Sequence, residues 1–171
     1  MKFKYIIILF VLLITFNKVN CEEIPLPVQN IKLLPAVLYK NAGSSFKILI
    51  QYNVSDEDNT LIGLGARFHF DSSKLSFTGA ENLFNLFKSP AVQEDKEDFD
   101  DRPETDYFVL VAWFEWNGRW PGLSMPCKLG DLEFKIKPDA KGIAEINVSF
   151  SANDLGYALD STPAKILILS D

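Results

Sequence analysis

Residues 62–70 read Ile-Gly-Leu-Gly-Ala-Arg-Phe-His-Phe, and this stretch decides the fold class. Its apolar side chains recur at every second position, which is the period that a β-strand imposes. The side chains that fall on one face are Ile62, Leu64, Ala66, Phe68 and Phe70. The opposite face carries two glycines, Gly63 and Gly65, followed by Arg67 and His69. The stretch therefore predicts a strand with one face in a hydrophobic core.

Similar patterns recur along the chain, and turn-forming residues separate them. Residues 46–54 alternate in the same way, and residues 107–116 are almost wholly apolar, which indicates a central strand covered on both faces. Further strands are predicted at 37–39, 75–78, 132–136, 143–150 and 165–169. One short helix is predicted at 80–87, where Leu83, Phe84 and Phe87 have helical spacing. Eight or nine short strands with at most one short helix predict an all-β sandwich or barrel.

The first 21 residues have the composition of a secretory signal peptide. Lys2 and Lys4 precede an apolar run from Tyr5 to Phe16, which is too short for the roughly 20 residues of a membrane-spanning helix. We expect cleavage after Cys21, which leaves one domain of residues 22–171 in a secreted, extracellular protein with no membrane insertion. The alternatives are a lipid anchor on Cys21, or a retained Cys21 that pairs with Cys127.

The predicted domain is strongly acidic. The whole chain has a formal net charge of −6, and loss of the three lysines in residues 1–21 lowers this charge to −9. Nucleic acids and anionic membranes need clustered lysine and arginine, so the charge argues against both as partners. Cations, neutral polysaccharides and basic protein surfaces remain as candidate ligands.

Residues 91–106 form an acidic segment whose only basic residues are Lys96 and Arg102. Crowded carboxylates repel one another, so such a segment is either solvated or neutralised by a cation. Calcium takes six to eight oxygen ligands, and the carboxylates crowded into this segment could supply several of them, so calcium is the candidate cofactor. The candidate metal ligands are Asp95, Asp98, Asp100, Asp101 and Asp106. The alternative is an acidic loop that binds no metal.

Aromatic residues form a second candidate site. Trp116 and Trp120 flank Asn117 and Arg119, and flat rings beside amide and guanidinium groups are suited to holding sugar rings. The sequence therefore predicts a ligand site at Trp116, Asn117, Arg119 and Trp120. The alternative is that Trp120 caps the sandwich and that Trp113 packs inside it.

Catalytic motifs are scarce. His69 is the only histidine, and its position opposite the core face predicts a surface or inter-strand residue. A glycosidase needs two carboxylates, of which Glu115 is the best single candidate because its apolar neighbours could raise its pKa. No second carboxylate stands out, so we expect a protein without catalytic residues.

The segment from Asp58 to Leu75 resembles the opening of bacterial cohesin-like domains. Those domains carry the pattern G-L-x-x-x-x-x-Y/F-D-x-S-x-L, and here Gly63-Leu64 is followed by Phe70-Asp71, Ser73 and Leu75 at the same spacing. Further short similarities to repeats of large secreted surface proteins lie at 105–113, 117–122 and 149–157.

This resemblance implies an antiparallel jelly-roll β-sandwich related to cohesins and to carbohydrate-binding modules. Cohesins bind dockerin domains through one sheet face, and the related modules bind polysaccharide, and neither class is catalytic. We therefore expect a secreted, non-catalytic binding module for an extracellular polysaccharide or a surface protein, with calcium as the candidate ion that would stiffen its acidic loop. The alternatives are a carbohydrate-binding module proper, with an aromatic platform, and a small glycoside hydrolase.

Overall fold

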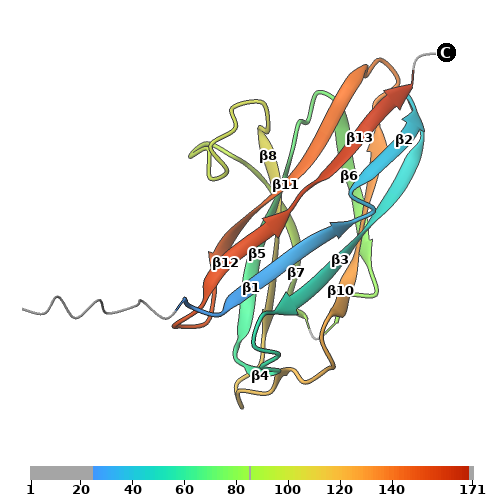
Figure 1. Cartoon of the computed structure of the whole chain (residues 1–171). Helices are drawn as coiled ribbons and strands as arrows, with labels where there is room; N and C mark the ends of the chain where they lie inside the picture. The colour runs from blue at the N-terminus through green and yellow to red at the C-terminus, as the bar shows by residue number, and fades with distance from the viewer. Residues whose placement is uncertain (1–24, 85, 170–171) are drawn as a thin grey trace, which may run out of the picture.

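Alternation along residues 45–54 shows how the core is built. In strand β3 (Ser45–Val54), every second side chain, from Phe46 to Val54, is buried, whereas the intervening side chains are more exposed. In the computed structural model, residues 25–84 and 86–169 are described, and their strands form two sheets that face each other across this core (Figure 1).

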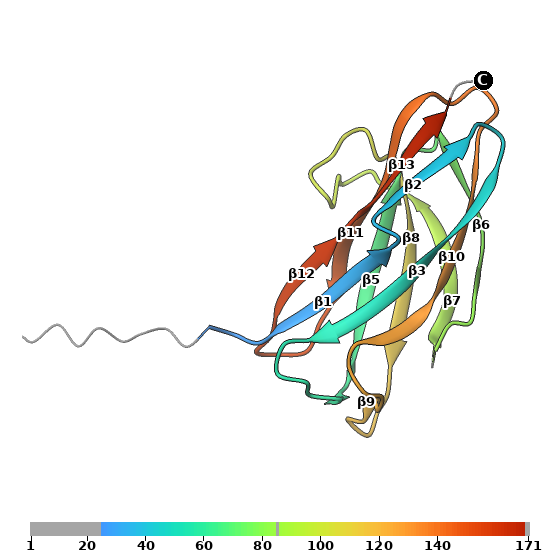
Figure 2. The ribbon, with the colours of Figure 1, turned by 45° about the vertical axis from the view of Figure 1, so that its right-hand side comes forward.

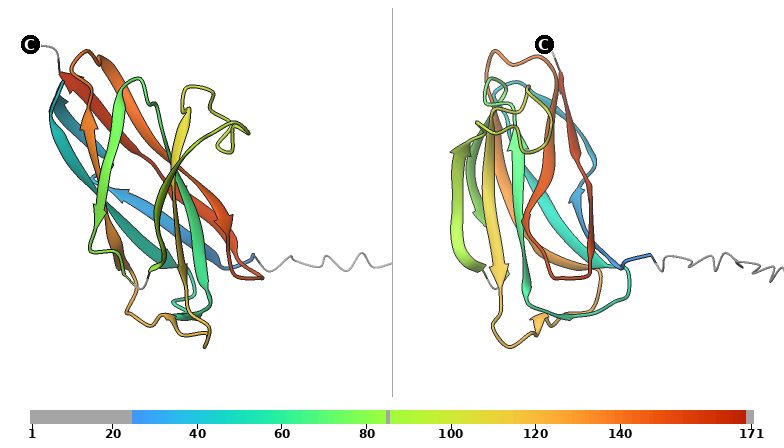
Figure 3. Two further views of the ribbon diagram at one scale, coloured as in Figure 1. Left: turned by 180° about the vertical axis from the view of Figure 1, so that it is seen from behind. Right: turned by 90° about the vertical axis from the view of Figure 1, so that its left-hand side faces the viewer.

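Two mixed sheets make up the sandwich (Figures 2 and 3). The five-stranded sheet has the order β12 (Ala158–Thr162), β1 (Val28–Leu34), β3, β10 (Cys127–Ile136) and β6 (Leu75–Glu81). The six-stranded sheet has the order β2 (Val37–Asn41), β13 (Ala164–Leu169), β11 (Gly142–Ala152), β5 (Gly63–Phe70), β8 (Tyr107–Phe114) and β7 (Leu86–Glu94). A small third sheet pairs β4 (Thr60–Leu61) with β9 (Trp120–Pro121) at one end of the sandwich.

Both ends of the described chain cross from one sheet to the other. β1 lies in the five-stranded sheet and β2 in the six-stranded sheet, and β12 and β13 divide in the same way. β1 pairs with β12 and β2 pairs with β13, and both pairs are parallel. The two terminal segments therefore tie the sheets together, and they leave the sandwich at opposite ends (Figure 1).

The predicted β-sandwich is confirmed, with differences in its elements. The structure adds β1, β7 and β12 to the predicted strands, together with the short β4 and β9, so the strand number exceeds eight or nine. The predicted helix at 80–87 is wrong, because β6 continues to Glu81 and β7 begins at Leu86. The backbone N–H of Phe84 donates to Leu129 of β10 at 2.9 Å, so this connection also follows the sheet.

Residues 1–24 lie outside the described part of the chain, so the predicted signal peptide and Cys21 lie outside it too. Cys127 is buried and is a free thiol. Within residues 25–84 and 86–169, no helix is long and apolar enough to cross a membrane.

Candidate functional site

The outer face of the six-stranded sheet is covered at one end by the connection between β7 and β8, which we name the acidic loop (residues 95–106). Arg67 projects outward from β5, and its guanidinium carbon lies 4.0 Å from the centre of the Phe99 ring. Arg102 of the loop reaches Glu145 of β11 at 3.3 Å. The loop therefore packs on the sheet. From the sequence alone, a fully solvated segment was one of the two alternatives.

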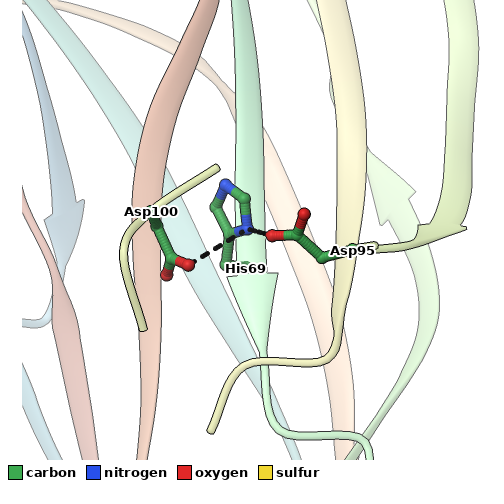
Figure 4. Close-up of side chains that lie close together, drawn as sticks. All are labelled: His69, Asp95 and Asp100. Carbon is green, nitrogen blue, oxygen red and sulfur yellow. Dashed lines mark ion pairs between the residues drawn. The ribbon is translucent and has the colours of Figure 1, made fainter. Parts of the chain in front are cut away.

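His69 lies beneath this loop. Its side chain is 0% exposed, so of the two predicted alternatives, a surface or an inter-strand residue, the first is wrong, while its place opposite the core face is as predicted. Its Nδ1 atom lies 2.8 Å from a carboxylate oxygen of Asp95 and 3.7 Å from one of Asp100. Figure 4 shows the imidazole of β5 between these two carboxylates of the loop. Burial arises because a segment about 30 residues further along the chain folds back over β5.

The other ring nitrogen of His69 is held by the sheet. Nε2 lies 2.7 Å from the hydroxyl of Ser149 on the neighbouring strand β11. Burial lowers the pKa of His69 below its ordinary value, and the nearby carboxylates of Asp100 and Asp95 offset this only in part.

Asp95 and Asp100 are the only two of the five predicted calcium ligands that converge on His69. Asp106 instead accepts hydrogen bonds from the backbone N–H and the hydroxyl of Ser72, at 2.6 and 2.5 Å. Asp98 accepts from the backbone N–H of Arg102 at 2.6 Å, and Asp101 is exposed. The carboxylates of Asp98 and Asp106 thus shape and anchor the loop. Sequence reasoning did not associate His69 with the loop, and its outward position on β5 was the available signal.

An apolar groove occupies the opposite end of the same sheet face. Pairing of Gly63 with Phe114 places the start of β5 beside the end of β8, far along both strands from the acidic loop. The groove has a volume of about 460 Å³, and its walls include Ile62, Trp116 and Leu155. Trp116 is 82% exposed and Leu155 is 99% exposed.

The Trp116 ring rises from the edge of this groove. It meets the ring of Phe114 edge to face, with ring centres 4.4 Å apart and an angle of 86° between the planes. At the floor, Gly63 leaves no space for a side chain, because an added Cβ atom would lie 2.2 Å from the carbonyl oxygen of Trp113. The side chain of Asp154, also in the lining, accepts hydrogen bonds from the N–H groups of Ile62 and Gly63 at 3.2–3.3 Å.

Trp120 does not join Trp116 in an exposed platform, which corrects the predicted ligand site. Pairing of β9 with β4 directs Trp120 into the core, where its ring centre lies 4.7 Å from that of Tyr52. Asn117 and Arg119 are exposed beside Trp116, as the prediction requires. The alternative of Trp120 as a cap and Trp113 as a core residue matches the structure.

Glu115 has a structural use in this turn. Its carboxylate accepts hydrogen bonds from the side chain of Asn117 at 2.6 Å and from the N–H of Arg119 at 2.9 Å. Partial loss of hydration acts to raise the pKa of Glu115, but these hydrogen bonds outweigh it and hold the pKa below its ordinary value. The expected rise is therefore wrong in direction, and a lowered pKa is unsuited to a general acid.

The fold is similar to several solved cohesin modules. The third cohesin ScaC of Acetivibrio cellulolyticus, solved with the ScaB dockerin, superposes with a TM-score of 0.55 at 15% identity, over 85% of this chain and all of that one. The sixth cohesin of scaffoldin B from the same organism, solved with the Cel5 dockerin, gives 0.54 at 16% identity, over 82% and 99%. The module CaCohA2 of Clostridium acetobutylicum gives 0.52 at 15% identity, over 84% and 90%.

No protein-family model and no curated protein sequence matches the chain. The solved modules nevertheless match the arrangement of the whole described domain, and the resemblance seen in residues 58–75 points to the same class. In its fold, the chain is a cohesin-like β-sandwich domain.

Proposed function

We propose that this chain is a secreted, non-catalytic module that binds a partner protein through the groove end of the six-stranded sheet. The observation that carries the proposal is the apolar groove beside Trp116 and Leu155, on a fold whose solved relatives include cohesins in complexes with dockerins. Grouped exposed apolar side chains are a common mark of protein-recognition surfaces.

The chemistry of the groove indicates the kind of partner. Trp116 and Leu155 stand almost free in solvent, so a partner that inserts apolar side chains between them would remove both from water. The domain itself carries a net charge of −9 without residues 1–21, and Asp154 lies within the groove. We therefore expect a protein that offers apolar residues surrounded by lysine and arginine, and dockerins are the first class to test.

The test begins with residues 22–171 immobilised and exposed to the secreted proteins of the source cells. Each captured protein is identified, purified and titrated, together with the ScaB and Cel5 dockerins as defined probes. We expect Trp116→Ala to raise the Kd of the partner at least tenfold, as removal of a central interface aromatic does. Tyr39→Ala is the matched control, because Tyr39 is a large exposed aromatic on β2, away from the groove.

Two results would contradict the proposal. Equal Kd values for the wild type and Trp116→Ala would remove the groove from the binding surface. Failure of every purified protein to bind saturably would argue against protein recognition altogether.

A second candidate, polysaccharide binding, rests on one observation: the Trp116 ring is exposed beside the exposed Asn117 and Arg119. A single ring with adjacent hydrogen-bonding groups is enough to hold one sugar ring. Retention on insoluble polysaccharide that Trp116→Ala abolishes would favour this function, and unchanged retention would exclude Trp116 from it.

A further inference from the structure

Three buried side chains that can bind a metal meet beneath the acidic loop. The side chains of His69 and Asp95 are 0% exposed, and that of Asp100 is 4% exposed. His69 belongs to β5, whereas Asp95 and Asp100 belong to the loop, so the cluster joins the loop to the sheet (Figure 4). Their potential ligand atoms lie within 4.8 Å of one another.

The Nδ1 atom of His69 has no hydrogen-bond partner among the described residues, although it faces both carboxylates. It lies at ion-pair distance, 2.8 Å, from a carboxylate oxygen of Asp95, but outside the alignment of a well-formed hydrogen bond. Buried polar atoms are almost always well hydrogen-bonded, so a buried nitrogen that faces two carboxylates without an aligned hydrogen bond requires an explanation. A metal ion bound between them would provide it.

The surrounding groups already hold the three side chains in place. Nε2 of His69 contacts the hydroxyl of Ser149 at 2.7 Å, which leaves Nδ1 as the nitrogen that faces the cluster. Asp100 accepts hydrogen bonds from the hydroxyl of Thr105 at 2.9 Å and from the side chain of Asn147 at 3.2 Å. Such outer contacts orient the ligands in metal sites, where the second ring nitrogen of a histidine is usually hydrogen-bonded.

The balance of charge also favours a cation. Two buried carboxylates surround one imidazole, which can carry at most a single positive charge. The guanidinium of Arg67 does not pair with them, since it lies over Phe99 and donates to the backbone carbonyl of Phe150 at 3.0 Å. Buried carboxylates without full compensation are costly, and a divalent ion would supply the missing charge.

We propose that His69, Asp95 and Asp100 bind a divalent transition-metal ion of the zinc class. Zinc accepts one imidazole nitrogen and two carboxylate oxygens at about 2.0–2.2 Å, with a water as the fourth ligand. Ligand atoms of a tetrahedral zinc ion lie about 3.3 Å apart. Binding therefore requires Nδ1 and the Asp95 oxygen, which are 2.8 Å apart, to separate slightly, and the Asp100 oxygen, which is 3.7 Å from Nδ1, to move closer. Calcium is less suited to this cluster, because it takes six to eight oxygen ligands. The bound ion clamps the acidic loop onto β5, independently of the proposed groove at the other end.

The test uses tag-free residues 22–171, treated with EDTA and then titrated with zinc chloride. We expect one equivalent of zinc to bind, with a rise of several degrees in Tm by mass action. Calcium chloride at millimolar concentration leaves Tm unchanged. His69→Gln and Asp100→Asn each weaken zinc binding at least tenfold, because each change alters one of the three direct ligands, and loss of even an outer contact typically weakens a metal site about tenfold or more.

Asp101→Asn is the matched control. Asp101 is exposed on the same loop and has a φ of 54°, which asparagine also tolerates, so this variant binds zinc as the wild type does. His69 is the only histidine in the chain, so its ring resonances report its coordination directly, without any substitution. We expect these resonances to shift with saturation at one equivalent of zinc.

Three outcomes would overturn the inference. The first is no binding up to millimolar zinc, and the second is binding that leaves the His69 resonances unmoved. The third is a calcium-dependent rise in Tm that Asp98→Asn and Asp101→Asn abolish, which would place the ion at the exposed carboxylates that the sequence suggested. The resonances of the wild type decide the matter even if His69→Gln fails to fold.

Discussion

Asp71 directly follows β5 and shapes the turn that leads into β6. Its carboxylate accepts a hydrogen bond from the backbone N–H of Ser73 at 2.8 Å and forms an ion pair with Lys74 at 3.0 Å. Its backbone carbonyl accepts a hydrogen bond from the N–H of Leu75 at 2.9 Å. Burial acts to raise the pKa of Asp71, but the bonds from Ser73 and Lys74 outweigh it and lower that pKa. The folded state thus prefers the ionised carboxylate.

A pH-dependent loss of stability follows from this lowered pKa. The contribution of Asp71 is present above its unfolded-state pKa and disappears as the pH falls through the lower pKa of the folded state. We expect Asp71→Asn to cost about 1 kcal/mol at pH 7 and to cost progressively less as the pH falls towards 3. Urea denaturation at several pH values measures this, with the exposed Asp139→Asn as control. A pH-independent difference would show that the charge of Asp71 is not involved.

For single residues, local turns could be predicted from the sequence, whereas burial by distant segments could not. The turn at Asp71-Ser72-Ser73 was predictable, because the residues that form it are adjacent in the chain. The burial of His69 was not, because it depends on Asp95 and Asp100 folding back from the next hairpin. Trp120 is similar, since its burial follows from the pairing of two very short strands.

Among the elements, β5 organises both ends of the outer sheet face. Its alternation was visible in the sequence because the inward side chains, from Leu64 to Phe70, all reach the core. The segment 80–87 was predicted wrongly as a helix, because three apolar residues at helical spacing are too few to distinguish a helix from a strand. Its pairing with β10, far along the chain, decided the structure.

Gly63 is the position of β5 that tolerates a side chain least. Its φ is +154°, and an added Cβ atom would lie 2.2 Å from the carbonyl oxygen of Trp113, which belongs to the backbone and cannot turn away. We expect Gly63→Ala to lower the free energy of unfolding by about 2–4 kcal/mol, through strain and overpacking. The urea midpoint measures the loss.

Gly79→Ala provides the comparison for that change. Gly79 also lies in a strand, β6, but an added Cβ atom there meets only a side-chain oxygen of Glu133 at 3.6 Å. We expect its stability to stay within about 0.5 kcal/mol of the wild type. A loss at Gly63 as small as the one expected at Gly79 would show that β5 and β8 can move apart at this point.

At the scale of the whole molecule, the sandwich is closed by its two terminal segments. The strands β12 and β13 pair with β1 and β2, more than 100 residues away in the chain. The mainly antiparallel pattern of the central strands was foreseeable from short connections, but these parallel pairs were not, because no local pattern encodes a partner at such a distance. The polar character of β12 (Ala158–Thr162) also concealed it as a strand.

Removal of the closing strands should prevent folding. A chain that ends at Gly156 lacks β12 and β13, and with them the buried Ala164 and Ile166 of the core. We expect this truncated chain to show no cooperative thermal transition, and a synthetic peptide of residues 157–171 added in excess to restore it. A cooperative transition without the peptide would mean that the other strands suffice for the core.

The parallel pairing of the terminal strands bears on how the domain responds to force. The described chain enters and leaves the sandwich at opposite ends, so tension applied between the two ends acts along β1 and β13 (Figure 1). These strands are held side by side to their neighbours over five or six residue pairs each. Their hydrogen bonds would therefore bear the load together, as in shear, and would not open one at a time. We therefore expect the domain to unfold at a higher force under this tension than a domain whose terminal strands peel away one hydrogen bond at a time.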